Sequence, residues 1–234
     1  MNTLSGQKWL DETMLERFEA EGMRPAQQAR SRALVIRLFN EGLTLLREVD
    51  FDGLSVDALC ARADSTIGAF YSRFESKEAF INALQRLVVA ATRRNVVAGY
   101  ESQVAPDDSV AHLLGWIVSG AIVWYRRYDG LVRASLRRAH SESDAWTPIR
   151  ELGELQVTYA VPRILALLPR PEDDNAEERI RFAFQMLFGT LNNMVMINPG
   201  PYSLGDPATA RMLAAAMTQF ILAGPTPEAL GSSL

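Results

Sequence analysis

The sequence predicts an all-α protein built from a small helical domain followed by a larger one. Apolar residues recur at a helical period along almost the whole chain, and no stretch alternates polar and apolar residues between turn signals as a strand does. Two helix starts are marked by a capping residue followed by proline, Thr147 with Pro148 and Asp206 with Pro207. A chain of 234 residues accommodates one small and one larger module that share a continuous core.

The expected helices follow from capping residues and turn signals along the chain. In the first half we predict helices over residues 32–49, 55–62, 66–74 and 77–100, with Ser55, Thr66 and Ser76 as caps. In the second half we predict helices over residues 109–129, 131–140, 147–168, 175–197 and 206–224, the third of them bent at Pro162. Residues 1–23 form an extra, mostly acidic helix in this prediction, and residues 225–234 a frayed tail.

Charge and cysteine content restrict the class of protein. The net charge is −4, with a balance of −3 over residues 1–23, +1 over residues 24–77, where eight basic residues face seven acidic ones, and −2 over residues 78–234. Any nucleic-acid surface must therefore be local. The single cysteine, Cys60, excludes an intrachain disulfide and favours a reducing cytoplasm. The N-terminus has no apolar run of a signal peptide, and the longest apolar stretch, 113–125, is shorter than the roughly 20 residues of a membrane span, so we expect no membrane partner.

Two short helices directly after a longer one are typical of a helix-turn-helix module. Phe70 and Phe74 are four residues apart and can point inward together. Gly68 and Ala69 are small, so the second short helix can approach the major groove of DNA closely. This pattern predicts a DNA-binding domain over residues 24–77 and a second helical domain over residues 78–224.

The run FDGLSVDALCARADSTIGAFYSRFESKEAFINAL, residues 51–84, resembles the N-terminal domain of the TetR family of transcriptional regulators. The residues that fall in place are Ser55, Val56, Leu59, Ala63, Gly68, Phe70, Tyr71, Phe74, Ser76, Lys77 and Glu78. The resemblance covers residues 30–84, and beyond them it is only architectural. It implies a homodimer that binds a palindromic double-stranded operator, acts as a repressor, and is released by a small, largely apolar effector.

The resemblance also implies roles for single residues. Ile67, Gly68 and Ala69 face base edges, and Ser72 lies at the outer side of the same helix. Phosphate contacts are implied for Ser55, Thr66, Tyr71 and Lys77, which are residue types that bind phosphates readily.

Three positions depart from the family pattern. Asp64 and Ser65 replace the usual Gly and Val of the turn, and Ile67 stands where a polar residue is frequent. Aspartate tolerates left-handed backbone geometry better than most residues, so the turn is retained. We expect DNA binding to be weaker or differently tuned.

In the second domain, large aromatic residues either line an effector cavity or belong to the core; the candidates are Trp116, Trp124, Tyr125 and Tyr128. Asn193, with its neighbour Asn192, can serve as a polar hook for a ligand or an interface. The last two long helices are apolar nearly all round, and we expect them to form the dimer interface. Arg126, Arg127, Arg133, Arg137 and Arg138 either pair with nearby acids or bind an anionic ligand such as an acyl-thioester or a carboxylate.

Two other classes of function compete. The only histidines, His112 and His140, lie in different predicted helices, and the sequence has no metal-ligand spacing, phosphate loop or nucleophile motif. We therefore predict neither an enzyme nor a metal or other cofactor. The alternative is a helical partner-binding protein that has lost DNA binding. The three departures from the family pattern and the nearly neutral charge of the first domain favour this alternative.

Overall fold

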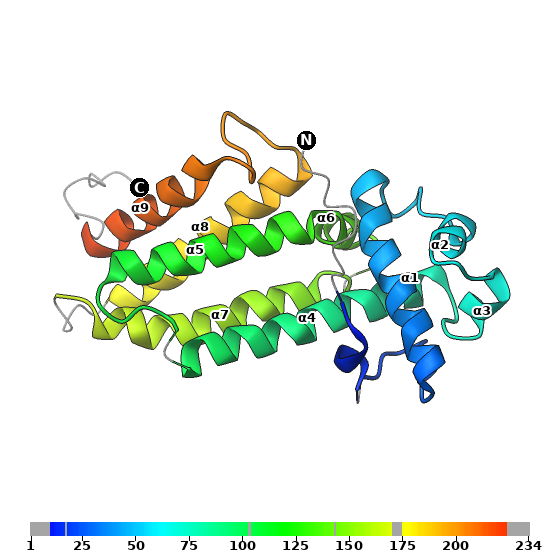
Figure 1. Cartoon of the computed structure of the whole chain (residues 1–234). Helices are drawn as coiled ribbons and strands as arrows, with labels where there is room; N and C mark the ends of the chain where they lie inside the picture. Colours follow the sequence, from blue (N-terminus) through cyan, green and yellow to red (C-terminus); the bar gives the residue numbers. More distant parts are fainter. Residues whose placement is uncertain (1–9, 17, 103, 143, 170–174, 224–234) are drawn as a thin grey trace. The chain divides into compact units, whose positions relative to one another are not determined.

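The computed structural model describes residues 10–16, 18–102, 104–142, 144–169 and 175–223, and these residues are helical apart from loops and one isolated bridge. The 3-10 helix η1 spans Glu12–Leu15. The α-helices are α1 (Ala29–Glu48), α2 (Val56–Arg62), α3 (Ile67–Tyr71), α4 (Lys77–Glu101), α5 (Val110–Arg127), α6 (Asp129–Arg138), α7 (Thr147–Ala166), α8 (Ala176–Met196) and α9 (Pro207–Ala223) (Figure 1). The all-α prediction is confirmed.

The chain divides into two compact units. The first comprises Met1–Arg94 and Gly130–Ile149, and the second comprises Asn95–Asp129 and Arg150–Leu234. Helix α4 therefore contributes to both units, and α6 belongs almost entirely to the first.

Aromatic rings form the core of the first unit. The side chains of Phe39, Phe70, Phe74 and Phe80 are all fully buried. Neighbouring ring centroids lie 5.1 to 5.6 Å apart in tilted or edge-on arrangements, which are favourable for aromatic pairs. The prediction that Phe70 and Phe74 point inward is confirmed. This core fixes α3 against α1 and α4 with one face left outward.

Helix α3 is shorter than the sequence predicts, because it ends at Tyr71 and not near Phe74. The hydroxyl of Ser72 donates to the carbonyl of Ala69 at 2.7 Å and closes the last turn. The next residue, Arg73, uses its own carbonyl to accept the backbone N–H of Arg24 at 2.8 Å. This contact with a segment distant in sequence draws the chain out of the helix.

The N-terminal segment also differs from its prediction. Of the helix expected over residues 1–23, the described part contains only η1, and residues 1–9 and 17 lie outside the described residues. Asn40 on α1 holds this segment: its side-chain carbonyl accepts the N–H of Leu10, and its amide donates to the Leu10 carbonyl, both at 3.0 Å. Met23 then forms an antiparallel bridge with Phe74.

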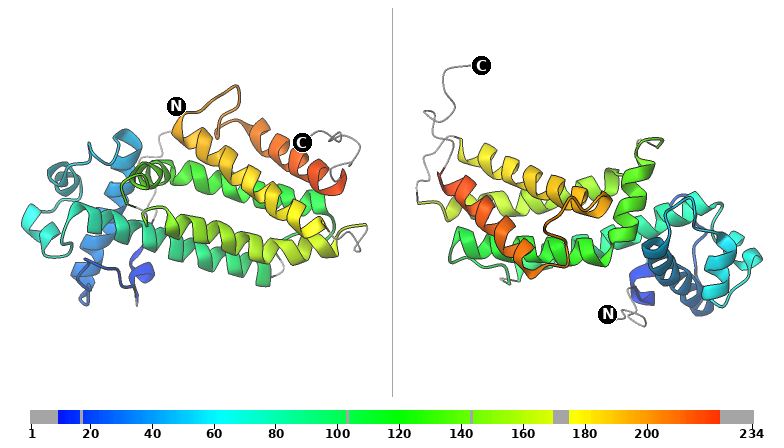
Figure 2. Two further views of the ribbon diagram at one scale, coloured as in Figure 1. Left: turned by 180° about the vertical axis from the view of Figure 1, so that it is seen from behind. Right: turned by 90° about the horizontal axis from the view of Figure 1, so that it is seen from above.

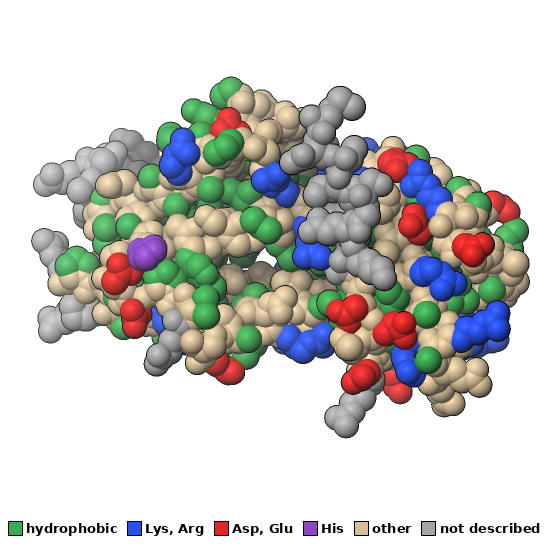
Figure 3. Space-filling model, viewed as in Figure 1, with side chains coloured by type: hydrophobic (Ala, Val, Ile, Leu, Met, Phe, Trp, Pro, Cys, Tyr) green, Lys and Arg blue, Asp and Glu red, His purple; other side chains and the backbone are tan. Residues whose placement is uncertain are grey.

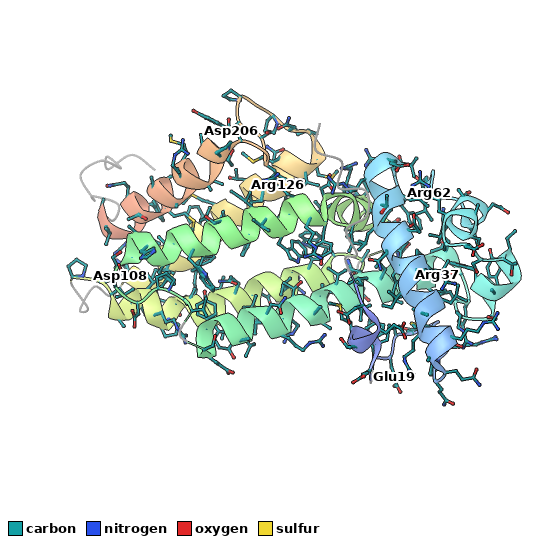
Figure 4. The ribbon with its side chains drawn as sticks, in the orientation of Figure 1. Glu19, Arg37, Arg62, Asp108, Arg126 and Asp206 are labelled. Atoms are coloured by element: carbon teal, nitrogen blue, oxygen red, sulfur yellow. The ribbon has the colours of Figure 1, made fainter. Side chains whose placement is uncertain are left out.

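In the second unit, α5 packs against both α8 and α9, and α8 packs against α9, as the two further views show (Figure 2). The predicted starts of α5 and α9 are confirmed. Ser109 caps α5 by accepting the N–H of His112, and Asp206 accepts the N–H of Ala208 at 2.7 Å. Figure 4 shows Asp108 and Asp206 just before these two helices. The predicted tail after residue 224 and most of the loop before α8 lie outside the described residues.

Candidate nucleic-acid interface

Two capping hydroxyls mark the starts of the short helices α2 and α3. Ser55 accepts the backbone N–H of Ala58 at 3.0 Å, and Thr66 accepts that of Ala69 at 3.1 Å. Both predicted caps are confirmed. Both side chains are exposed, and a hydroxyl oxygen that accepts one bond still has its own hydrogen to donate. Each cap can therefore stabilise its helix and contact a phosphate at the same time.

The turn between α2 and α3 has the left-handed geometry that the sequence predicts at Asp64. This residue has a φ of 48°, a conformation that aspartate adopts more readily than most non-glycine residues. The next N–H, that of Ser65, donates to the carbonyl of Cys60 at 2.9 Å. Asp64 therefore retains the turn, although the family pattern has glycine at this position.

The outward face of α3 is the surface expected to meet bases. The side chains of Ile67 and Tyr71 are 43% and 48% exposed, and Gly68 between them is also exposed. A Cβ built on Gly68 would meet only the Thr66 hydroxyl, at 4.0 Å, so no side chain covers the helix backbone at this position. Ala69 is half-buried, and Ser72 is exposed. An exposed apolar residue among small neighbours can contact a thymine methyl group.

Lys77 lies at the start of α4 and is half-buried. Its ammonium group donates to the carbonyl of Phe51 at 3.0 Å and to that of Asp52 at 3.5 Å. An ammonium group has three donors, so one remains for an external acceptor. The structure thus gives Lys77 an internal role that its sequence position did not predict.

Two arginines hold α2 against α1. Arg37 on α1 donates to the carbonyl of Ala63 at 3.1 Å. Arg62 on α2 forms a two-pronged pair with Glu48, at 3.0 and 2.7 Å, which lowers the pKa of that carboxyl group. Figure 4 labels both arginines. These contacts fix the two helices on which the exposed α3 depends.

The predicted effector residues fall into two groups in the second unit. Trp124 lies 5.4 Å, ring centroid to centroid, from both Tyr125 and Tyr128. Trp116 forms an edge-on contact with Tyr100, also at 5.4 Å. The structure therefore does not bring Trp116 into ring contact with the other three.

The asparagines of α8 have different surroundings. Asn193 is exposed, whereas Asn192 accepts a hydrogen bond from the hydroxyl of Tyr125 at 2.8 Å. Burial raises the pKa of the Tyr125 hydroxyl, so it stays protonated as a donor. A period of 3.6 residues separates the two neighbours onto different faces, and only packing shows which face is internal.

Two members of the predicted basic cluster pair with acids. Arg137 donates to Asp50 at 2.8 Å. Arg138, which is buried, binds both carboxylate oxygens of Glu142 and the side-chain oxygen of Asn82. The acid-paired alternative is therefore observed for these two residues. Cys60 is buried, and burial raises the pKa of its thiol.

No helix within the described ranges has the length and apolar character needed to cross a membrane. The described residues likewise contain no group of three or more His, Cys, Asp or Glu side chains placed to hold a metal ion.

Comparisons with known proteins agree with this geometry. Residues 38–84, which run from α1 through α2 and α3 into α4, match the family described as bacterial regulatory proteins, tetR family. The solved structure of Salmonella enterica GusR is 14% identical and shares the fold with a TM-score of 0.57, over 81% of this chain and 95% of that chain. SCO3833 from Streptomyces coelicolor A3, described as a member of the TetR transcriptional regulator family, is 22% identical over 81% of this chain and 90% of that chain, with a TM-score of 0.44. No curated protein matches the chain.

The matched segment coincides with the helix-turn-helix whose caps, turn and exposed face are described above, and the helical fold continues beyond it as in the similar solved structure. Residues 38–84 therefore form a helix-turn-helix domain of the tetR family of bacterial regulatory proteins.

Proposed function

We propose that the protein is a repressor that binds a palindromic operator as a homodimer and is released by a small, largely apolar effector. The observation that carries the DNA-binding part is the exposed face of α3. On this face the side chains of Ile67 and Tyr71 are exposed, and Gly68 between them has no side chain. The helix begins next to Thr66, whose hydroxyl caps it. Base-facing and phosphate-binding groups thus lie on one short, rigidly supported helix.

Dimerisation is supported by exposed apolar stripes on α8 and α9. Phe182 and Met186 are exposed on α8, and Gly189 continues the same stripe at helical spacing. Met212 and Leu222 are exposed on α9, which packs against α8. Exposed apolar side chains on two helices that pack together fit an isologous interface, in which each subunit supplies the same two helices.

The proposed effector site lies within the second unit. The space-filling view shows a hollow between α5 and α7 (Figure 3). Helix α5 is rich in apolar and aromatic residues, and the paired Tyr125 hydroxyl and Asn192 amide supply polar groups nearby. A mostly apolar wall with few polar groups suits a small apolar molecule. Effector binding can release DNA only if the effector prefers the conformation that does not bind the operator.

Selection from a random duplex library, at two salt concentrations, tests the DNA-binding proposal. We expect an enriched inverted repeat whose affinity falls with salt, because phosphate contacts release counterions. A folded protein that enriches no sequence would contradict the proposal and favour the partner-binding alternative. Added apolar compounds that bind the protein without changing operator affinity would contradict the release mechanism.

The dimer is tested by Phe182→Glu together with Met186→Glu, examined by sedimentation. Two charges in a desolvated apolar interface should give monomers and lower the affinity for the full inverted repeat. A matched variant, Glu151→Gln with Glu154→Gln on α7, changes two exposed residues outside these stripes and should leave the dimer intact. An unchanged sedimentation coefficient for the α8 variant would place the interface elsewhere.

A further inference from the structure

The segment before and within α1 has an unusual charge. Residues 22–40 contain four arginines and no acidic residue, in a chain whose net charge is −4. Acidic residues stop at Glu21 and resume at Glu41. The sign of the charge therefore changes abruptly where the chain enters the helix-turn-helix unit.

Backbone pairing holds the start of this segment beside the end of α3. The N–H of Arg24 donates to the carbonyl of Arg73 at 2.8 Å, and the N–H of Glu75 donates to the carbonyl of Gly22 at 2.9 Å. Gly22 has a φ of +69°, and a Cβ at this position would lie 2.7 Å from the Cβ of Ala79. Only glycine fits both the backbone conformation and the close approach.

The guanidinium group of Arg73 extends this anchor toward α1. It donates to the carbonyl of Pro25 at 3.3 Å and to the hydroxyl of Ser31 at 2.8 Å. Residues 22–31, which we call the N-terminal arm, are thus bonded near one end to Arg73 and Glu75, which follow α3, and at Ser31 to the side chain of Arg73. The arm has a fixed position next to the proposed recognition helix, within the same unit.

Two arginines of the arm face solvent. Arg24 and Arg30 are exposed, and neither forms a side-chain hydrogen bond or an ion pair within the described residues. The other arginines nearby are engaged, since Arg32 donates to the carbonyl of Gln27 and Arg37 to that of Ala63. Two guanidinium groups without a side-chain partner among the described residues are therefore available on the surface of the arm. Arginine is well suited to bind phosphate oxygens, because its planar fork offers two parallel donors.

We propose that the N-terminal arm is a second DNA-binding element, in which Arg24 and Arg30 bind phosphates that flank the base pairs faced by α3. The proposal rests on the proposed DNA-binding function and adds a contact outside the helix-turn-helix. The partner is the same duplex, because the arm is hydrogen-bonded to the end of α3 and carries only positive charge. Since the anchored arm needs no ordering on binding, its charges contribute without a large loss of conformational entropy.

The first test compares Arg24→Gln with Arg30→Gln, as a double variant, against Arg86→Gln with Arg150→Gln. Both double variants remove two exposed positive charges, and the control lies outside the arm and the helix-turn-helix. Anisotropy titrations on the selected operator, across a salt series, give the affinity and its salt dependence. We expect the arm variant to bind at least tenfold more weakly, and its salt slope should fall by about one for each phosphate that it no longer binds. The control variant should match the wild type, and equal melting temperatures verify folding.

The second test shortens the duplex at both ends. Loss of the flanking phosphates should lower the affinity of the wild type to that of the arm variant, while the arm variant should be insensitive to the shortening. If the wild type binds the operator and the arm variant binds equally tightly with the same salt slope, the arm proposal is wrong and the DNA-binding function stands. If the arm variant loses the same affinity relative to the wild type on long and on short duplexes, the proposal that Arg24 and Arg30 bind the flanking phosphates is also wrong. A wild type that binds no duplex overturns the function and the arm proposal together.

Discussion

The ammonium group of Lys77 donates a hydrogen bond to the carbonyl of Phe51 at 3.0 Å and lies 4.5 Å from the centroid of the same residue's ring. The guanidinium group of Arg138 lies 4.8 Å from that centroid as well. Phe51 therefore interacts with one cation from α4 and one from α6. The turn that follows α1 is thereby fixed to both helices inside the first unit.

Replacing Lys77 with Met should affect stability and DNA binding together. The change leaves the Phe51 carbonyl without its donor and should lower the free energy of unfolding by about 1 kcal/mol. Operator affinity should fall evenly across DNA sequences, with a salt slope reduced by about one, if the third donor binds a phosphate. Phe51→Leu is the matched control, because it keeps the carbonyl and should leave the salt slope unchanged. A Lys77 variant that changes sequence preference while keeping its overall affinity would contradict the phosphate role.

Replacing Tyr71 with Phe should weaken operator binding by about 1 kcal/mol, which is a several-fold loss of affinity. The hydroxyl is on a side chain that is 48% exposed, so folding stability should stay the same. A neutral hydroxyl releases no counterion, and the salt slope should therefore not change, in contrast to the Lys77 variant. Titration of a DNA panel checks the result, and unchanged affinity would remove Tyr71 from the interface.

Changing Ile67 to Asn should alter which sequences are bound. An asparagine can form two hydrogen bonds with adenine, whereas isoleucine can only make apolar contact with a base such as thymine. Because Ile67 is 43% exposed, the free energy of unfolding should change by less than about 0.5 kcal/mol. Library selection with the variant should give a different base at one position in each half-site. The same enriched sequence for both proteins would show that Ile67 does not face a base.

Gly130→Ala should destabilise the protein because α6 begins in close contact with the end of α1. A Cβ at Gly130 would lie 2.2 Å from the carbonyl oxygen of Leu46, and this neighbour is backbone that cannot rotate away. We expect a loss of about 1–3 kcal/mol in chemical denaturation. Gly120→Ala in α5 is the control, since a Cβ there meets nothing within 4 Å and alanine should stabilise that helix by up to about 1 kcal/mol. Equal effects of the two substitutions would contradict the close approach.

The pKa of Asp50 should lie below its ordinary value, and it should rise only in part when Arg137 is changed to Gln. The main cause of the low pKa is the backbone N–H of Gly53, which donates to the carboxylate at 3.0 Å, and the guanidinium group of Arg137 adds to it. Because the pKa is depressed in the folded state, this carboxylate stabilises the fold at neutral pH. That contribution is lost as the pH falls below about 4 toward the folded-state pKa. Titration of the carboxyl carbon by NMR measures the pKa, and a value at or above the ordinary one would contradict the observed contacts.

Local signals in the sequence determined the helix-turn-helix. Ser55 and Thr66 have hydroxyl oxygens that accept the backbone N–H three residues ahead, so their capping role depends only on nearby residues. The spacing of Phe70 and Phe74 was sufficient to predict a shared inward direction, although α3 ends before Phe74. The left-handed turn at Asp64 is also a local property, because it follows from the side chain and its immediate neighbours.

Contacts between distant segments were decided only by the tertiary structure. The N-terminal arm pairs with residues beyond α3, and Asn40 binds Leu10 from 30 positions away. The described residues before the arm therefore contain only the short helix η1 where the sequence predicted a longer helix. The same holds for Lys77 at the Phe51 carbonyl and for the choice between Asn192 and Asn193. Helical periodicity shows which residues share a face, but the partner that covers a face depends on the packing of the whole unit. The acid-free run over residues 22–40 was visible in the sequence, and only the pairing of Arg24 with Arg73 showed that its first residues lie beside the end of α3.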